Sequence, residues 1–220
     1  MNFDPTHWLL VLPGIILGLT VHEYAHAWVA DYLGDSTSAY AGRLTLNPLA
    51  HLDLMGFLML MLAGFGWAKP VPINPLRFQG NMRTGIALVS IAGPLANLLM
   101  AFTGALIFYL SFPEGTFIGQ TSGSIGVQML LGLIQINVVL AVFNLIPVPP
   151  LDGSKILASI LPPQSGNAFL QLERHGPLIL IALIFLGVIG KILLPLVILV
   201  RGIVFNSAGL IAGVVLKLFS

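Results

Sequence analysis

The chain has 220 residues, of which 57% are hydrophobic and 8% are charged, and its mean hydropathy is +0.98. These values lie far outside the range of soluble globular proteins, so we expect an integral membrane protein in a lipid bilayer. The net charge is +1 without a basic run, which argues against a nucleic-acid partner. The chain has no cysteine, so disulfides and thiolate metal sites are excluded and a metal would need His, Asp or Glu.

The first expected membrane-spanning helix runs from about Trp8 to Tyr32 and carries three ionisable residues in its later half, His22, Glu23 and His26. Ionisable groups at membrane depth cost at least a few kcal/mol each and usually mark a functional site. His22 and His26 are four residues apart, so on a helix both imidazoles lie on one face, where they can bind one metal ion.

Residues 22–26 form the pattern His-Glu-x-x-His, which is typical of zinc metalloproteases. In this pattern the histidines bind zinc, and the glutamate on the adjoining face takes a proton from the water that zinc activates. A structural alternative stays open, in which the histidines bond to nearby carbonyls and Glu23 pairs with a distant cation. The absence of Lys and Arg before Arg43 argues against that alternative.

The stretch from about Asp35 to Arg83 combines polar, apolar and proline-rich segments. Its apolar run Leu54 to Phe65 is too short to cross a bilayer comfortably and suits a re-entrant segment. Arg43 to Leu46 alternates polar and apolar residues, as an extended strand or hairpin would. We therefore expect a membrane-associated β-hairpin and re-entrant region after the first helix.

Two further spans are expected at about Thr84 to Leu110 and Ile125 to Ile146, and Pro147 to Pro150 must end the second of these helices. The apolar stretch Leu178 to Ser220 indicates two more helices. The predicted fold is an all-α polytopic membrane protein with about five to six transmembrane helices. We expect a single membrane-embedded domain over residues 1–220, with a catalytic core at about 8–155 and C-terminal helices at about 177–220.

Lysine and arginine are unevenly distributed between the predicted loops. Six lie in the loop between the first and second spans or in the polar connection that follows the third, whereas residues 1–7 and 111–124 have none. The positive-inside rule therefore places the N-terminus outside the cell membrane and the histidine pair toward the cytoplasmic half. The six residues are Arg43, Lys69, Arg77, Arg83, Lys155 and Arg174.

Two histidines leave a catalytic zinc site incomplete, because such a site normally has three protein ligands and one open position. Asp152 is the best candidate for the third ligand, since it is the only acidic residue between Glu114 and Glu173 and follows the span that returns to the inner side. The proline break before it would let the chain fold back toward the metal. A plain turn at this position stays open as an alternative, and His51 and Asp53 compete as ligands.

Three motifs resemble the site-2 protease family of intramembrane metalloproteases, peptidase family M50. They are His22-Glu-Tyr-Ala-His26, the stretch from Asn144 to Gly153, and Gly93-Pro-Leu-Ala-Asn97. The resemblance covers about residues 8–155, and the chain is similar to compact prokaryotic members without a PDZ or cystathionine-synthase-type (CBS) domain.

The resemblance implies one zinc ion per chain on His22, His26 and Asp152, with Glu23 as the catalytic base. It also implies hydrolysis of a peptide bond within a transmembrane helix of a membrane-protein substrate, the activity known as regulated intramembrane proteolysis. An oligomer is compatible with this interpretation.

The same resemblance implies that Asn144 and Asn97 bind the substrate or support the site. Asn144 could equally cap or bridge helices, and Gly93 with Asn97 also forms a packing face of small and polar residues. The alternative function is a transporter or a non-proteolytic metal-binding membrane protein. Such a protein would have no need of Glu23 between its histidines.

Overall fold

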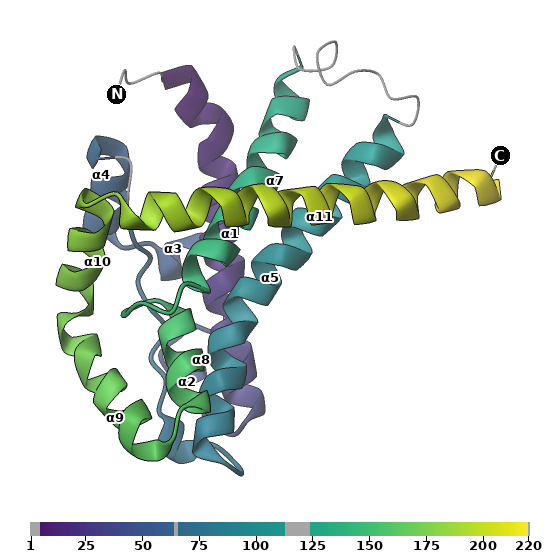
Figure 1. The fold of residues 1–220 in the computed structure, drawn as a ribbon. Helices are drawn as coiled ribbons and strands as arrows, with labels where there is room; N and C mark the ends of the chain where they lie inside the picture. The colour runs from purple at the N-terminus through teal and green to yellow at the C-terminus, as the bar shows by residue number, and fades with distance from the viewer. Residues whose placement is uncertain (1–4, 64–65, 113–123, 220) are drawn as a thin grey trace. The chain divides into compact units, whose positions relative to one another are not determined.

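The computed structural model describes residues 5–63, 66–112 and 124–219, and helices dominate these residues (Figure 1). The four long helices are α1 (Pro5–Tyr32), α5 (Met82–Ser111), α7 (Ile125–Asn144) and α11 (Val188–Phe219). The shorter ones are α2 (Thr37–Tyr40), α3 (Pro48–His51), α4 (Leu54–Ala63), η1 (Pro75–Arg77), α8 (Asp152–Ile160), α9 (Pro163–Gln171), η2 (Leu172–His175) and α10 (Gly176–Phe185).

Four helices among the described residues are long and apolar enough to cross a membrane, namely Trp8–Tyr32, Met82–Ser111, Ile125–Asn144 and Val188–Leu218. The chain is therefore a multi-pass membrane protein, and the first three predicted spans are confirmed. Both predicted C-terminal helices are present as α10 and α11. However, α10 has 10 residues and is only about 15 Å long at 1.5 Å per residue, roughly half the hydrocarbon thickness. The predicted number of five to six spans is therefore not confirmed.

The region after α1 contains short helices and turns where the sequence predicted a β-hairpin. The Arg43 N–H donates to the Ser38 carbonyl at 2.8 Å, which closes the turn after α2. Over the described part of the chain, β-pairing is limited to one isolated antiparallel bridge between Leu52 and Ala68. The predicted hairpin is thus not confirmed. The predicted re-entrant run begins as helix α4, and its last two residues, 64–65, lie outside the described residues.

The chain divides into two compact units, and the first comprises residues 1–18, 97–143 and 187–220. It contains the first part of α1, the second part of α5, α7 except for its last residue Asn144, and all of α11. A Cβ atom on Gly14 would lie 2.9 Å from Cα of Leu133, so α1 and α7 approach closely through a small residue. The core of this unit consists of Ala101, Ala105, Ile134, Val138, Val142, Val197, Val204 and Ala208, which join α5, α7 and α11.

The second unit comprises residues 19–96 and 144–186. Its α1 and α5 portions pack together through a core of Ala30, Phe78 and Val89. Helix α7 ends before the prolines as predicted, at Asn144 and not at the expected Ile146, and the chain enters helix again at Asp152.

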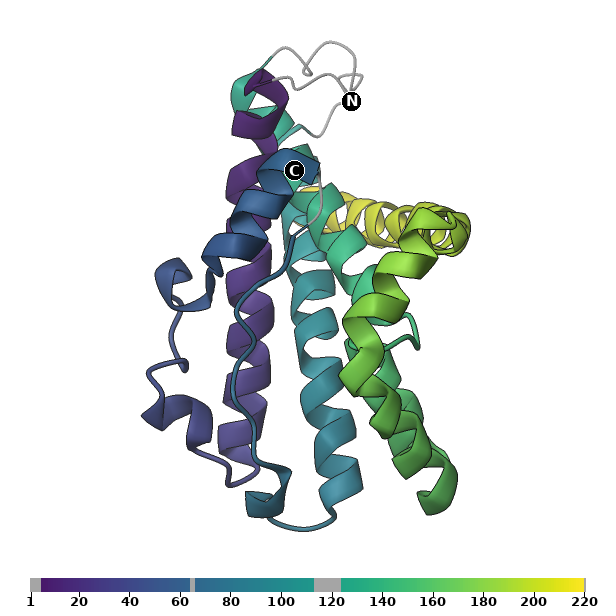
Figure 2. The same cartoon turned by 90° about the vertical axis from the view of Figure 1, so that its left-hand side faces the viewer.

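An extended segment, residues 68–74, connects α4 to η1 and runs alongside α1 in the second unit (Figure 2). Its backbone is tied down along its length. The Lys69 N–H donates to the His51 carbonyl at 2.8 Å, and the Ser38 hydroxyl donates to the Pro72 carbonyl at 2.6 Å. At its end the Asn74 N–H donates to Oδ2 of Asp35 at 2.6 Å. These bonds hold the segment beside the later half of α1, where His22, Glu23 and His26 lie.

Candidate metal centre

The two histidines of α1 present their Nε2 atoms to one another at 3.0 Å, with the rings nearly perpendicular at 89°. This follows from their four-residue spacing on one helix face. Nδ1 of His26 lies 2.7 Å from the carbonyl oxygen of Val89 on α5. A carbonyl can only accept, so Nδ1 carries a proton and Nε2 is the nitrogen that faces the cluster. Nε2 of His26 is therefore the atom of this ring that can bind a metal ion.

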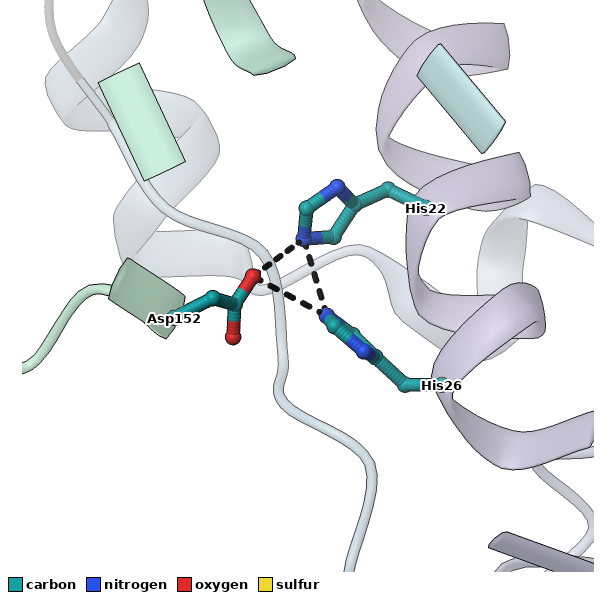
Figure 3. A group of neighbouring side chains, drawn as sticks. All are labelled: His22, His26 and Asp152. Carbon is teal, nitrogen blue, oxygen red and sulfur yellow. Dashed lines mark hydrogen bonds and ion pairs between the residues drawn. The ribbon is translucent and has the colours of Figure 1, made fainter. Parts of the chain in front are cut away.

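Asp152 meets these histidines from the start of α8, as Figure 3 shows. Its Oδ2 lies 3.2 Å from Nε2 of His22 and 3.2 Å from Nε2 of His26. Burial acts to raise the pKa of the Asp152 carboxyl, but the two imidazoles beside it more than offset this and hold the pKa below its ordinary value. The side chain is thus a carboxylate, the form in which it can bind a cation.

The spacing of the two Nε2 atoms and Oδ2 of Asp152 matches that of three protein ligands around a tetrahedral zinc ion. In a tetrahedral site with bonds of about 2.0–2.1 Å, two ligand atoms stand roughly 3.3 Å apart. The three separations here are 3.0, 3.2 and 3.2 Å, and all three residues are buried. Oδ2 of Asp152 is buried without a hydrogen-bond partner among the described residues, which is costly unless a cation satisfies it.

Glu23 lies next to this cluster in sequence and is held by the extended segment. Its side chain is buried, and Oε2 accepts a hydrogen bond from the Val71 N–H at 3.1 Å. Glu23 does not belong to the group of three ligand atoms. One carboxylate oxygen is therefore fixed by a backbone donor, and the carboxylate keeps lone pairs that can accept a proton.

Gly93 of α5 packs directly against both histidine rings. A Cβ atom at this position would lie 2.5 Å from Nε2 of His26 and 2.6 Å from Cε1 of His22. Only a residue without a side chain leaves the rings where they are. Sequence reasoning noted Gly93 as part of a motif but could not see this contact, because it depends on how α5 packs on α1.

A cavity of about 450 Å³ opens at the cluster. Such a volume lies in the range of ligand-binding clefts. The Lys155–Glu173 ion pair, 3.6 Å long, contributes to its wall. Polar lining comes from His22, Glu23, His26, Ser90, Asn144, Asp152, Lys155 and Glu173, and apolar lining from Pro70, Val71, Ile73, Pro75, Phe78, Ile86, Val89 and Pro150.

The two asparagines that the sequence singled out lie in different places. Asn144 lines the cavity. Asn97 belongs to the first unit, where it is fully buried and its Nδ2 donates to the Gly18 carbonyl at 2.9 Å and to Oδ1 of Asn137 at 2.8 Å. Asn137, which sequence reasoning missed, thus joins Asn97 in a polar network between α1, α5 and α7.

The competing ligands His51 and Asp53 lie outside the group of three ligand atoms. Nε2 of His51 donates to the Thr45 carbonyl at 2.8 Å, and Oδ1 of Asp53 accepts from the Gly56 N–H at 2.7 Å. Both residues therefore tie down the region between α2 and α4.

Comparison with known proteins gives a consistent result. Residues 110–187 match the sequence profile of Peptidase family M50. YwhC of Bacillus subtilis, whose name assigns it provisionally as a zinc metalloprotease, is 40% identical over 183 residues, which cover 83% of this chain and 83% of YwhC. Rip2 of Mycolicibacterium smegmatis, named in the same provisional way, is 30% identical over 191 residues, 84% of this chain and 70% of Rip2.

A more distant relative is the zinc metalloprotease MJ0392 of Methanocaldococcus jannaschii, which is 26% identical over 159 residues, 72% of this chain and 36% of that protein. No solved structure matches the chain with significance.

Proposed function

This chain belongs to peptidase family M50 and is a zinc metalloendopeptidase, and we propose that it cleaves peptide bonds within or near transmembrane helices of membrane-protein substrates. The proposal rests on one observation. Two histidines of α1, a helix apolar enough to span a bilayer, meet the carboxylate of Asp152 from α8. We further propose that both compact units form one protease domain, since α1 and α5 each run without a break from one unit into the other.

We assign His22, His26 and Asp152 as the zinc ligands. Their mutual distances, their burial and the unsatisfied Oδ2 of Asp152 support this assignment. The Val89 carbonyl orients the ring of His26, as second partners of metal-binding histidines do. When bound, zinc supplies Lewis acidity that activates water near neutral pH and polarises a peptide carbonyl.

Glu23 is the proposed general base. It lines the same cavity as the three ligands, and the Val71 N–H fixes one of its carboxylate oxygens. The carboxylate would take a proton from the attacking water and later deliver it to the leaving amine. Mutation of this group should therefore remove catalysis and leave the metal in place.

The substrate is proposed to be a transmembrane helix that unwinds locally at the cavity. The site lies on the apolar span Trp8–Tyr32, and half of the cavity lining is apolar, which suits a segment drawn from the bilayer. A helical peptide bond is shielded while its hydrogen bonds persist, so helix-breaking residues near the cleaved bond should favour hydrolysis. Asn144, in the cavity wall, is the proposed contact to the substrate backbone, with Asn97 in a supporting role.

The distribution of basic residues supports an orientation. The six lysines and arginines of the loops after the first and third spans all belong to the second unit, which also holds the metal cluster. The positive-inside rule then places this cluster toward the cytoplasmic half of the cell membrane and the N-terminus outside.

The function is tested by cleavage of a reconstituted transmembrane substrate, with the products identified by mass spectrometry. Glu23→Gln should keep one zinc ion per chain while the cleavage rate falls by about 10²–10⁴-fold, the usual contribution of a general base. Asp31→Asn makes the same change from carboxylate to amide on the same helix and should leave the rate unchanged, because Asp31 does not line the cavity.

Full cleavage by the Glu23→Gln variant would contradict the assignment of the base. Zinc uptake across the membrane that is equal in wild type and Glu23→Gln, without any cleavage, would instead favour a transporter.

A further inference from the structure

Arg43 is a buried cation that has no acidic partner among the described residues. Its side chain is only 7% exposed, and no carboxylate lies within ion-pair distance of it among the residues that the structure describes. Its Nη2 donates instead to the carbonyl of Lys69 at 3.1 Å and to that of Pro70 at 3.0 Å. A buried charge that is compensated only by neutral carbonyls is unfavourable, so the position of those carbonyls needs an explanation.

The Pro70 carbonyl, which accepts from Arg43, belongs to the same peptide group that contacts Glu23. The oxygen of Pro70 and the N–H of Val71 are the two ends of one planar peptide unit, and that N–H donates to Oε2 of Glu23 at 3.1 Å. Pro70 and Pro72 have no N–H, so Val71 provides the single amide proton of residues 70–72. A donor that fixes the oxygen of a planar unit also fixes the direction of its N–H and polarises it.

We propose that Arg43 is a positioning residue that acts through the Pro70–Val71 peptide to hold the carboxylate of Glu23 in its working orientation. The inference rests on the proposed role of Glu23 as the base. It assigns Arg43 a role in catalysis although Arg43 does not line the cavity and touches neither the metal cluster nor Glu23 itself.

Ser38 provides a matched control on the same segment. Its hydroxyl donates to the Pro72 carbonyl at 2.6 Å, two peptide groups further along, and so anchors the extended segment without touching the Pro70–Val71 peptide. Ser38→Ala and Arg43→Gln therefore each remove side-chain bonds to the segment. Only the second change releases the peptide that binds Glu23.

The direct readout is hydrogen exchange at the Val71 amide in the purified, zinc-loaded protein. Arg43→Gln should accelerate this exchange by about tenfold or more, the effect of losing a charge-assisted hydrogen bond. Arg43→Lys keeps the charge and should restore part of the protection, while Ser38→Ala should leave it near the wild-type value. This readout requires no catalysis, so it decides the inference even if no transmembrane substrate is cleaved and the proposed function fails.

The second readout is a double-mutant cycle in which kcat is measured for Arg43→Gln in the wild-type and Glu23→Gln backgrounds. Arg43→Gln should lower kcat by about 10–100-fold with unchanged KM and zinc content, and it should add little further loss in a Glu23→Gln background, because both changes disable the same group. Unchanged exchange at Val71 in both Arg43 variants would overturn the proposal. So would an equal fall in kcat in the wild-type and Glu23→Gln backgrounds.

Discussion

Gly93 is the position where one added methyl group should disable the metal cluster. In Gly93→Ala the new Cβ would lie 2.5 Å from Nε2 of His26 and 2.7 Å from Nε2 of His22, whereas ordinary contact begins near 3.4 Å. Both rings would have to retreat by about 0.8 Å. The His26 ring cannot do so freely, since the Val89 carbonyl on the same helix α5 holds its other nitrogen.

The size of the effect follows from the tightness of the cluster. The ligand atoms are separated by only 3.0–3.2 Å, so a displacement of this size moves at least one nitrogen out of bonding position. Disturbance of the groups that orient metal ligands typically weakens metal binding by about 10–100-fold, which is roughly 1.4–2.8 kcal/mol. We expect a loss of zinc affinity in this range for Gly93→Ala.

The assay is a competition titration of the purified protein with a zinc chelator. Gly213→Ala is the control, because it makes the same substitution in the apolar helix α11 where a Cβ meets nothing within 4 Å. In both variants alanine is the better helix former by about 1 kcal/mol, so loss of helix cannot explain a difference. Wild-type zinc affinity in Gly93→Ala would show that the histidine rings do not need the space at residue 93 to bind zinc.

Two further predictions concern the asparagines. Asn97→Ala removes donors to Gly18 and Asn137 in a fully buried network and should lower the free energy of unfolding by about 1–3 kcal/mol, seen as a lower Tm in detergent, while zinc content stays at one per chain. Asn144→Ala removes a polar group from the cavity wall and should lower kcat/KM by roughly tenfold, whereas unchanged kcat/KM would show that Asn144 does not contact the substrate.

The long helices and the histidine pair could be predicted from local patterns alone. Continuous apolar runs predict α1, α5 and α7 because length and hydropathy suffice to recognise a span. His22 and His26 share a helix face through their spacing, which holds in any helix. Asp152, 126 residues after His26, was predicted from the proline break and the family resemblance, and the structure brings its Oδ2 to 3.2 Å from both rings.

Features that depend on packing between distant segments could not be predicted. The Val71 contact to Glu23 joins residues 48 positions apart and uses a backbone N–H, which has no signature in sequence. The close approach of Gly93 to the histidines likewise depends on the register of α5 against α1. The boundary between α10 and α11 lies at Gly187, whose φ is +71°, and hydropathy alone does not locate this break because the stretch is apolar on both sides of it.

The central claim is that His22, His26 and Asp152 together hold one zinc ion. The most direct test is elemental analysis of detergent-purified wild type, His22→Ala and Asp152→Asn, with Asp31→Asn as a control on the same helix as the histidines. We expect one zinc ion per chain in wild type and the control, and loss or strong weakening of binding in both ligand variants. Zinc retained at wild-type affinity in folded Asp152→Asn would contradict the claim.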